Sequence, residues 1–384
     1  MDPQTAARVA AHVEANARRY FPDLTGPCRI VERSIHASSH PIACFELRFA
    51  GATRRVIAKR GEVHPTNNES RAEFENFTLF NARNVVPDVH CPRALDFLEG
   101  ENVVITEAVS GENLLGLWRR VSTSPWARPD GRMKGLIRLS ARWLRSFHEI
   151  RSTVHASPMS SADLGALRSY QAKLSAGERS ITGAGTYTLG PEVHSKLSAV
   201  LDALEADRDG ILHAYGTPHR DFGTGNILAH GGSITVIDAS SSEQHPLLID
   251  VTYFLVTLSA VKTFGFGGDA ASAGYAGEFL DAYFGADRER IVSSLSFSIL
   301  RLRSLLLQAI RHMERARRLP FPASAVTLRY FKLGYSSEIL ASLAAIEGKR
   351  LAAHRSPRSC LWSIAGGAAA PLAQDAGGQA QEIL

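Results

Sequence analysis

The sequence predicts an α+β protein of two lobes, a small β-rich N-terminal lobe and a larger, mostly helical C-terminal lobe. Short apolar strands alternate with one helix over residues 28–109, whereas helical periodicity dominates the region that follows. The chain of 384 residues, 45% of them hydrophobic, is long enough to bury one or two sizeable cores. We therefore expect one lobe at 1–109, a second at 110–365, and a disordered Ala-, Gly- and Gln-rich tail at 366–384.

The N-terminal lobe is expected to begin with a helix over residues 1–20 and to contain an apolar strand at Arg55–Lys59. A second helix follows, because three phenylalanines recur with the spacing of a buried helical face: Phe74, Phe77 and Phe80. A carboxylate on this helix could pair with Lys59. Glu73, fourteen residues after the lysine, is the favoured partner, and Glu69 is the alternative.

The C-terminal lobe is predicted from a periodic helix, a variable region and a hairpin. The helix spans 132–150 and carries His148 near its end, which we expect to be a packed structural histidine. Residues 151–210 are predicted to be helical with Ser, Gly and Pro breaks. Residues 226–237 alternate around a Gly-Gly turn as a β-hairpin would, which would bring Asn226 and Asp238 together.

The loop before this hairpin has the most informative residues of the chain. Residues 219–226 read H-R-D-F-G-T-G-N, the H-x-D-x-x-x-x-N spacing of a kinase catalytic loop. A hydroxyl nucleophile needs a carboxylate that accepts its proton, and Mg²⁺ prefers oxygen ligands. Asp221 is therefore the predicted catalytic base, and Asn226 and Asp238 are the predicted ligands of the Mg²⁺ that accompanies ATP or another nucleoside triphosphate.

Two further segments fit a nucleotide site. The strand ending at Lys59 matches the kinase strand whose lysine binds the α- and β-phosphates. Residues 102–111 predict a buried strand that runs into a polar connection between the lobes. Its backbone groups would bind the adenine edge, at Thr106, Glu107, Ala108 and Val109. A plain core strand is the alternative.

The loop over residues 34–41 would cover the phosphates. It contains no glycine, so it lacks the residue that lets backbone N–H groups approach phosphate most closely. Ser38 and Ser39 could donate hydrogen bonds to the phosphates instead. A simple turn between two strands is the alternative.

Taken together, these motifs resemble the aminoglycoside phosphotransferase family, a small-molecule branch of the protein-kinase-like fold, over about residues 34–258. The family's loop usually reads H-G-D-x-x-x-x-N and its metal motif I-D-W/F-D/E. Here Arg220 replaces the glycine, and Asp238 is followed by Ala239 and Ser240. The resemblance also implies that Asp250 supports the catalytic loop.

The resemblance implies ATP-dependent phosphorylation of a hydroxyl on a small molecule, such as a sugar, an amino alcohol, an antibiotic or a glycan-like acceptor. The altered metal motif and the glycine-free loop leave a nucleotide-binding pseudokinase scaffold as the alternative. A protein kinase is the weaker alternative, because Asp250 lies only twelve residues after Asp238 and no activation segment ending in A-P-E is evident.

The charge pattern bears on the acceptor. Lys and Arg number 43 against 38 Asp and Glu, a net charge of +5, whereas a pocket for polycationic aminoglycosides should be rich in carboxylates. Six arginines cluster on one helical stretch: Arg301, Arg303, Arg311, Arg315, Arg317 and Arg318. They form either a solvated basic face or a surface for an anionic acceptor, glycan or membrane. Nucleic-acid binding is not expected, since aromatic residues do not alternate with these arginines.

The sequence predicts a cytoplasmic protein. No apolar run reaches the roughly 18 residues that span a bilayer, and the first twenty residues lack the core of a signal peptide. The four cysteines contain no C-x-x-C pair, so we expect free thiols: Cys28, Cys44, Cys91 and Cys360.

Overall fold

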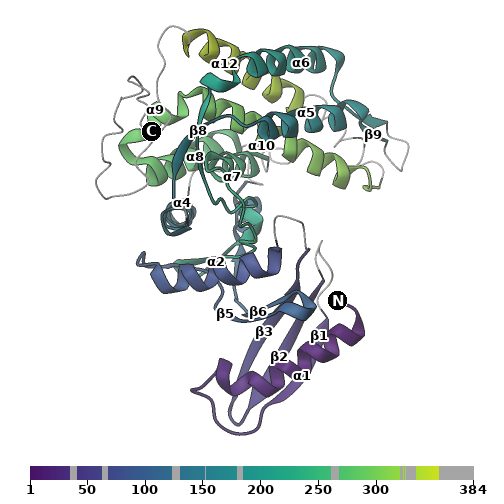
Figure 1. Ribbon diagram of the computed structural model, residues 1–384, viewed down its shortest axis with the longest axis vertical. Coiled ribbons are helices and arrows are strands. Elements are labelled where there is room, and N and C mark those ends of the chain that lie inside the picture. The colour runs from purple at the N-terminus through teal and green to yellow at the C-terminus, as the bar shows by residue number, and fades with distance from the viewer. Residues whose placement is uncertain are drawn as a thin grey trace, which may run out of the picture.

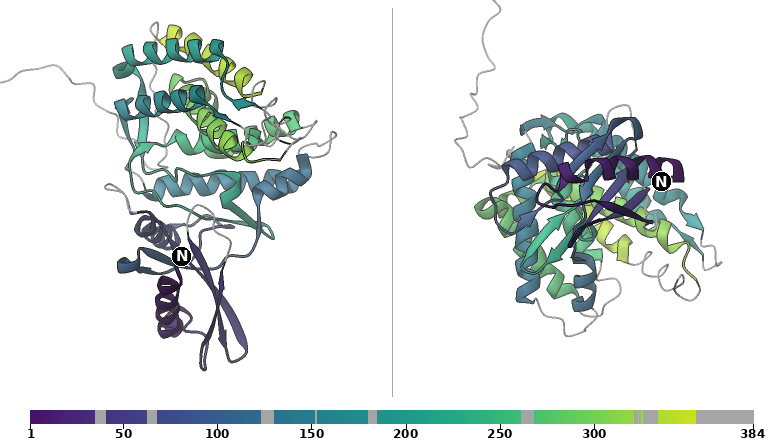
Figure 2. Two further views of the ribbon diagram at one scale, coloured as in Figure 1. Left: turned by 90° about the vertical axis from the view of Figure 1, so that its right-hand side faces the viewer. Right: turned by 90° about the horizontal axis from the view of Figure 1, so that it is seen from below.

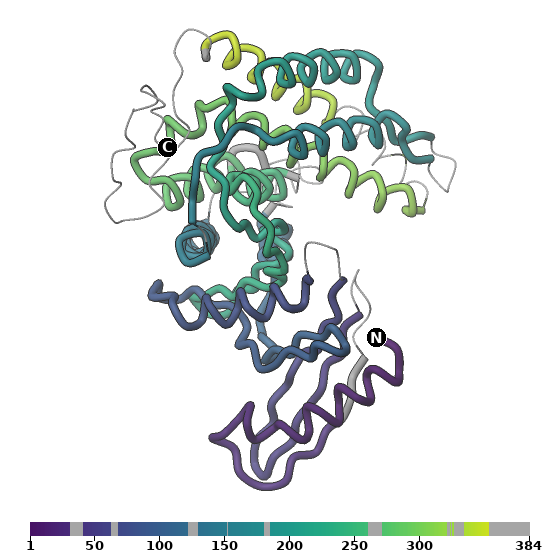
Figure 3. Tube along the Cα trace, in the orientation of Figure 1, coloured from purple at the N-terminus to yellow at the C-terminus, as the bar shows by residue number. Residues whose placement is uncertain are grey.

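The computed structural model describes residues 1–34, 41–62, 68–122, 130–151, 153–179, 185–260, 268–320, 323, 325 and 334–353. Figure 1 shows an N-terminal lobe built on an antiparallel sheet and a larger lobe made mostly of helices, as the sequence predicted. Figure 3 shows the chain leaving the N-terminal sheet for the helical lobe after β6 (Val103–Glu107).

The N-terminal sheet has five antiparallel strands in the order β1-β2-β3-β6-β5. The other four strands are β1 (Arg29–Ser34), β2 (Ile42–Phe49), β3 (Ala52–Arg60) and β5 (Ala94–Leu98). Helix α1 (Pro3–Tyr20) begins where the Asp2 side chain accepts a hydrogen bond of 2.8 Å from the Thr5 N–H, a standard N-cap. Its buried face forms one core with the sheet, in which Val9 packs with Phe45 and Val56.

Helix α2 (Glu69–Arg83) joins the two lobes. It packs against β5 and β6 on one side and against α4 (Gly131–Arg151) on the other. Phe77 and Phe80 belong to the core of the helical lobe, where Phe80 stacks on Trp143 at 5.0 Å. Phe74 is only half-buried and lies against Phe97 of the sheet. The helix therefore holds side chains from both lobes in fixed positions.

The helical lobe is arranged around α7 and α10, which pack on each other. Its helices are α3 (Leu114–Ser122), α4, α5 (Ser161–Ala176), α6 (Pro191–Ala206), α7 (Leu248–Ala260), α8 (Gly268–Phe284), α9 (Arg288–Val292), α10 (Leu295–Ala316) and α12 (Ser336–Ala353). The left view of Figure 2 shows α4 lengthwise at the edge of this lobe nearest to the sheet. The predicted helix at 132–150 is therefore present.

Small sheets position the loops. Strands β12 (Ile227–His230) and β13 (Ser233–Val236) form the predicted hairpin, with Ile227 opposite Val236. Strands β4 (Val89–His90) and β7 (Glu112–Asn113) complete this sheet in the order β4-β13-β12-β7. The hairpin register places residues 226 and 237 side by side at its open end.

The region 151–210, expected to be helical, also contains strands. β8 (His155–Pro158) pairs with β11 (Leu212–Gly216), and β11 also pairs with β14 (His245–Pro246). β9 (Glu178–Arg179) pairs with β10 (Thr186–Tyr187). β8 is specified by a distant partner, so the local periodicity of the sequence does not reveal it. β9 and β10 are two residues long each, too short for an alternating pattern.

Among the described residues, no single helix is long and apolar enough to cross a membrane. Only the bent pair 271–292 and 295–316, joined at 106°, passes that test, by length and composition alone. Cys28, Cys44 and Cys91 are free thiols, as predicted, and Cys360 lies outside the described residues, as does the whole tail 366–384.

Candidate active site

A cavity of about 870 Å³ lies between the two lobes. The N-terminal lobe contributes Ile42, Lys59 and Glu69. The helical lobe contributes the catalytic-loop motif, the segment after Asp238, and side chains of α5, α7 and α10: Tyr170, His219, Arg220, Asp221, Asn226, Asp238, Ser240, Ser241, Glu243, Ile249, Tyr253, Arg303, Ser304, Leu307, Arg311 and Arg315. Four residues that the sequence marks as functional thus meet in one space: Lys59, Asp221, Asn226 and Asp238.

Lys59 connects the lobes through two carboxylates. Its Nζ donates to Glu73 Oε2 at 2.8 Å and to Asp238 Oδ1 at 2.7 Å. The side chains of Lys59 and Glu73 are only 10% and 6% exposed. Burial by itself lowers the pKa of Lys59, but the two carboxylates outweigh it and raise that pKa above its ordinary value. The lysine is therefore a fixed cation at the mouth of the predicted nucleotide site.

The choice between Glu73 and Glu69 follows from where α2 begins. Asn68 caps the helix by accepting a hydrogen bond from the Arg71 N–H, which places Glu69 in the first turn. There the Glu69 carboxylate accepts a hydrogen bond of 3.0 Å from the Glu62 N–H. Glu73 lies about one turn further along, and its side chain reaches Lys59, so the predicted pair forms.

The catalytic-loop motif brings Asp221 and Asn226 into contact. Asn226 Nδ2 donates to the Asp221 carboxylate and to the Asp221 carbonyl, at 2.9 Å in each case. Because Asn226 Nδ2 faces Asp221, the other side-chain atom of the amide, Oδ1, faces away from Asp221. Oδ1 is an oxygen that can bind a metal ion. Phe222 anchors the loop by stacking on Trp143 at 5.6 Å, and a Cβ at Gly223 would come within 3.1 Å of the Tyr253 ring.

Asp250 supports the loop, as the resemblance implied. Its carboxylate accepts hydrogen bonds from the backbone N–H groups of His219, at 2.6 Å, and Arg220, at 2.7 Å. Arg220 has φ 69°, a left-handed conformation that costs energy for a residue with a Cβ and needs such support. His148 Nε2 contacts the same carboxylate at 2.9 Å, and the histidine is fully buried. His148 is therefore structural, as expected.

His219 links the loop to the metal segment. Its Nε2 donates to the Ile237 carbonyl at 3.0 Å, and the ring is almost fully buried. Burial lowers the pKa of His219, even though Asp250 and Asp221 act in the opposite direction. The ring is therefore neutral and holds the strand end that presents Asp238.

Asn76 on α2 is a residue that sequence reasoning missed. Its Nδ2 donates to the carbonyl groups of Ala239, at 2.6 Å, and Ser241, at 3.0 Å. Asp238 has φ 66°, another left-handed residue, so the segment after it needs fixed partners. Asn76 supplies them from the helix that also carries Glu73. The sequence offered one indication of this role: Asn76 lies four residues before Phe80, on the same face of α2 as the phenylalanines.

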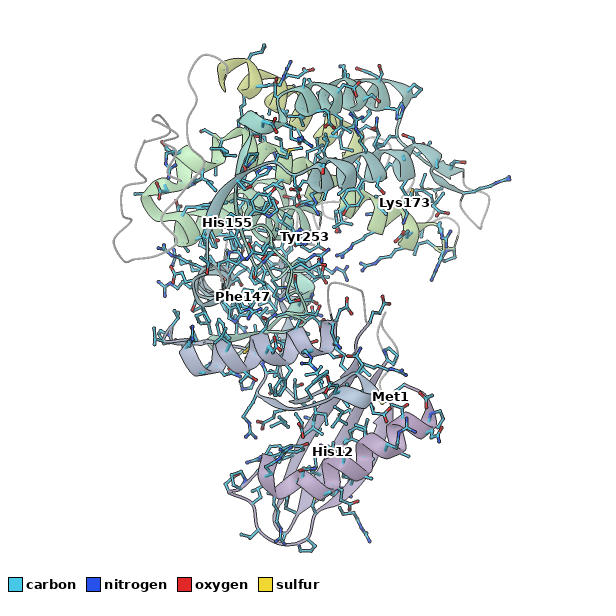
Figure 4. The ribbon with its side chains drawn as sticks, in the orientation of Figure 1. Met1, His12, Phe147, His155, Lys173 and Tyr253 are labelled. Carbon is cyan, nitrogen blue, oxygen red and sulfur yellow. The ribbon has the colours of Figure 1, made fainter. Side chains whose placement is uncertain are left out.

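The second missed contact is the one that Arg311 makes with the predicted base. Arg311 Nη1 donates to Asp221 Oδ1 at 2.8 Å and also to the Tyr253 hydroxyl. Its guanidinium carbon lies 5.2 Å from the centre of the Tyr253 ring. Figure 4 shows Tyr253 within the helical lobe. Arg311 belongs to the basic cluster noted in the sequence, but 90 residues separate it from Asp221.

The basic cluster, on α10 and just beyond its end, divides into three groups. Arg303, Arg311 and Arg315 line the cavity, whereas Arg301 and Arg318 are exposed outside its lining. Arg317 pairs with Glu178 at 2.6 Å. The interpretation as a solvated basic face therefore fits only part of the cluster. The spacing of the helix turns Arg303, Arg311 and Arg315 towards the cavity that contains Asp221.

The remaining predicted nucleotide contacts are less defined. Ser38 and Ser39 lie outside the described residues. In the connection between the lobes, the Glu107 N–H donates to the Arg93 carbonyl and the Ala108 N–H to the Arg55 carbonyl, both at 2.9 Å. Adenine binding by the backbone N–H and C=O groups of residues 106–109 stays a prediction.

The oxygen atoms beside the cavity suit Mg²⁺. Among the described residues, no group of three His, Cys, Asp or Glu side chains could hold a metal ion. A kinase-type site needs fewer protein ligands, since nucleotide phosphates complete the coordination. Asn226 Oδ1 and the Asp238 carboxylate, 39% exposed, are oxygen donors of this kind. The chemistry of the donors therefore fits the predicted metal.

Comparison with known proteins agrees with this geometry. The model of the phosphotransferase enzyme family, APH, matches residues 47–291, more than half of the chain. No match to a curated protein was found. The solved structures that resemble this one share its fold.

Three of them illustrate the likeness. A protein from Ralstonia eutropha JMP134, provisionally described as an aminoglycoside phosphotransferase, has a TM-score of 0.53 and 15% identity over 88% of this chain and 98% of its own. A glucosamine kinase in complex with glucosamine, ADP and inorganic phosphate has a TM-score of 0.51 and 14% identity over 90% and 87%. Choline kinase from Cryptosporidium parvum Iowa II has a TM-score of 0.50 and 12% identity over 90% and 98%.

The structural similarity shows a common protein-kinase-like fold, and the family match shows the class of enzyme. The protein is a kinase that transfers a phosphoryl group to a hydroxyl of a small molecule, so the scaffold alternative is set aside. The chain belongs to the phosphotransferase enzyme family, as its motifs predicted.

Proposed function

We propose that this kinase uses Mg²⁺ and ATP, with Asp221 as the base that activates the acceptor hydroxyl. One observation carries the proposal. Asp221 and Asn226 touch in the catalytic loop, while Lys59 of the other lobe reaches Asp238 at 2.7 Å across the same cavity. A base, oxygen donors for a metal and a phosphate-binding cation therefore face one space.

The reaction forms a bond between the acceptor oxygen and the γ-phosphorus and breaks the bond from that phosphorus to ADP. Asp221 would orient the hydroxyl and take its proton. Asn226 and Asp238 would hold Mg²⁺, which neutralises charge on the phosphate oxygens when it is bound. Lys59, fixed by Glu73, would bind the phosphates from the side of the sheet.

Arg220 does not fill the role of a metal ligand or base. Its Nη1 donates to Glu243 Oε2 at 2.8 Å, which turns the side chain towards the rim of the cavity. Ser240 stands at the position of the family's second acid, so Asp238 is the only carboxylate of the metal motif. We propose that a metal held there relies more on nucleotide phosphates than in relatives that carry the second acid.

A small hydroxyl compound as the acceptor is in keeping with the fold, which glucosamine kinase and choline kinase share. We also propose a cytoplasmic location, because the reaction consumes ATP. Contact with a membrane or an anionic glycan would use the exposed Arg318, just beyond the end of α10.

The test is a screen for acceptor-dependent ADP release by the full chain with Mg²⁺ and ATP, over neutral, anionic and cationic hydroxyl compounds. A hit is checked by mass spectrometry for one added phosphoryl group. In parallel, calorimetry measures binding of AMP-PNP, a non-hydrolysable ATP analogue, with and without Mg²⁺. Lys59→Met should weaken AMP-PNP binding. Equal affinity in Lys59→Met and wild type would contradict the proposed nucleotide site.

A further inference from the structure

The face of α10 that borders the cavity carries a row of arginines. Arg303, Arg311 and Arg315, with Leu307 between the first two, are spaced four residues apart, and all four line the cavity. Side chains at this spacing share one face of a helix. With a rise of about 1.5 Å per residue, the row extends over roughly 18 Å.

The partners of these arginines differ along the row. Arg303 Nη1 pairs with Asp163 at 3.0 Å, and both side chains are nearly buried, with 14% and 7% exposed. The Asp163 carboxylate also accepts a hydrogen bond of 2.6 Å from the Tyr215 hydroxyl. The buried Asp163 carboxylate therefore compensates the charge of Arg303, and we assign Arg303 a structural role.

Arg311 and Arg315 are placed differently. Arg311 contacts Asp221, and its guanidinium is held over the Tyr253 ring. Arg315 is exposed at the cavity, and no carboxylate of the described residues pairs with it. Asp221 thus offsets one of the two cations, which leaves the space next to the predicted base with a surplus of positive charge.

The apolar walls beside these arginines favour a bound anion. The cavity is also lined by Tyr253 and Ile249 on α7, Tyr170 on α5 and Leu307 on α10. Tyr253 is only 5% exposed, and its burial raises the pKa of the hydroxyl, so the ring stays neutral. Charged hydrogen bonds are stronger where water is partly excluded, and the fixed Arg311 loses little side-chain entropy when it binds an oxyanion.

We propose that Arg311 and Arg315 form a subsite for an anionic group, a carboxylate or a phosphate, on the acceptor itself. The proposal rests on the proposed function, because it requires the acceptor hydroxyl to lie at Asp221. It names the substrate class: a small hydroxy compound that already carries a negative charge. A polycationic amino sugar would place its ammonium groups against these two arginines.

The contact between Arg311 and Asp221 limits the size of this acceptor. The hydroxyl binds Asp221, Asp221 lies 2.8 Å from Arg311, and Arg311 binds the anion. Three hydrogen-bond lengths of about 2.8 Å, with about 2 Å across the carboxylate and about 2 Å across the guanidinium, allow a separation of at most roughly 13 Å between the reacting oxygen and the anion. A short hydroxy acid, a sugar acid or a sugar phosphate meets this limit.

The test is calorimetric titration of the full chain, saturated with Mg²⁺ and AMP-PNP, with malonate and with inorganic phosphate at constant ionic strength. AMP-PNP fills the position of the transferred phosphate, so the anions report the acceptor half of the cavity. The two probes distinguish a carboxylate subsite from a phosphate subsite. Arg315→Gln is the test variant, and Arg301→Gln, at an exposed arginine of the same helix outside the lining of the described cavity, is the matched control.

We expect at least one anion to bind the wild type and the Arg301→Gln variant equally. Loss of a charged hydrogen bond should weaken that binding about 10- to 100-fold in Arg315→Gln. The inference is overturned if neither anion binds the wild type, or if Arg315→Gln binds both as tightly as the wild type does. Failure of AMP-PNP to bind at all would instead overturn the proposed function, so the two failures are distinct.

Discussion

Replacement of Glu73 by glutamine should impair both stability and nucleotide binding, because it leaves a buried lysine with one carboxylate fewer. The Lys59–Glu73 pair is 2.8 Å long, and at an effective dielectric constant of about 20 its attraction is about 6 kcal/mol before desolvation is subtracted. Removing one member of a buried pair typically costs about 3–5 kcal/mol. Asp238 still contacts Lys59 at 2.7 Å, so we expect a loss near the lower end, about 3 kcal/mol.

The same substitution should also weaken nucleotide binding. Without Glu73, Lys59 is held only by Asp238, the predicted metal ligand, so the lysine and the metal compete for the same carboxylate. Affinity for AMP-PNP with Mg²⁺ should fall about 10- to 100-fold, which corresponds to roughly 1.4–2.8 kcal/mol.

Urea denaturation of Glu73→Gln gives the change in unfolding free energy, and calorimetry gives the change in affinity. Glu69→Gln is the matched control, since it removes an equal charge from the same helix at a carboxylate that accepts a hydrogen bond from the Glu62 N–H. The control should lose less than about 1 kcal/mol. A Glu69→Gln variant as impaired as Glu73→Gln, or a Glu73→Gln variant with wild-type stability and affinity, would refute the reasoning.

Three further predictions concern the metal, the loop and the effect of pH. Asp238→Ala should weaken AMP-PNP binding far more with Mg²⁺ than without it in calorimetry, and an equal loss in both conditions would exclude Asp238 as a metal ligand. Asn76→Ala should lower the unfolding free energy by about 1–3 kcal/mol, measured in urea, because two buried carbonyl groups lose their donor; an unchanged value would contradict the support assigned to it. Burial lowers the pKa of His213 to about 4 from 6.5, so its stability contribution is present above pH 6.5 and is lost as pH falls towards 4, by up to about 3 kcal/mol. His213→Phe should flatten the pH dependence of urea stability in that range, and a slope equal to the wild type's would contradict this assignment.

The sequence predicted the parts of the site that depend on short spacings. The loop motif places Asp221 and Asn226 five residues apart, and the hairpin brings Asp238 back beside them through a local register. The pairing of Lys59 with Glu73 followed from a strand and a helix that are adjacent in the chain. In each case a local pattern determines which face a side chain occupies.

Contacts between distant segments could not be predicted in this way. Asn76 meets Ala239 across 163 residues, and Arg311 meets Asp221 across 90. Neither contact produces a periodic pattern of residues in the sequence, because each depends on how whole helices pack. Strand β8 was missed for the same reason, since it is specified by its partner β11.

The net charge of the chain gave only a weak indication of the acceptor. The value of +5 describes the whole surface, whereas the cavity also contains the carboxylates of Glu69, Asp221, Asp238 and Glu243. What favours an anionic acceptor is the placement of Arg311 and Arg315 beside the predicted base. That placement is a property of the fold and required the structure.

The central claim is that Asp221 activates the acceptor hydroxyl, and the most direct measurement is the turnover of Asp221→Asn on an acceptor found in the screen. Asparagine keeps the size of the side chain but removes the base, so we expect kcat to fall about 10²- to 10⁴-fold. Calorimetry on the same variant should give an AMP-PNP affinity close to that of the wild type, because Lys59 and Asp238 are unchanged. Near-wild-type turnover by Asp221→Asn would contradict the account.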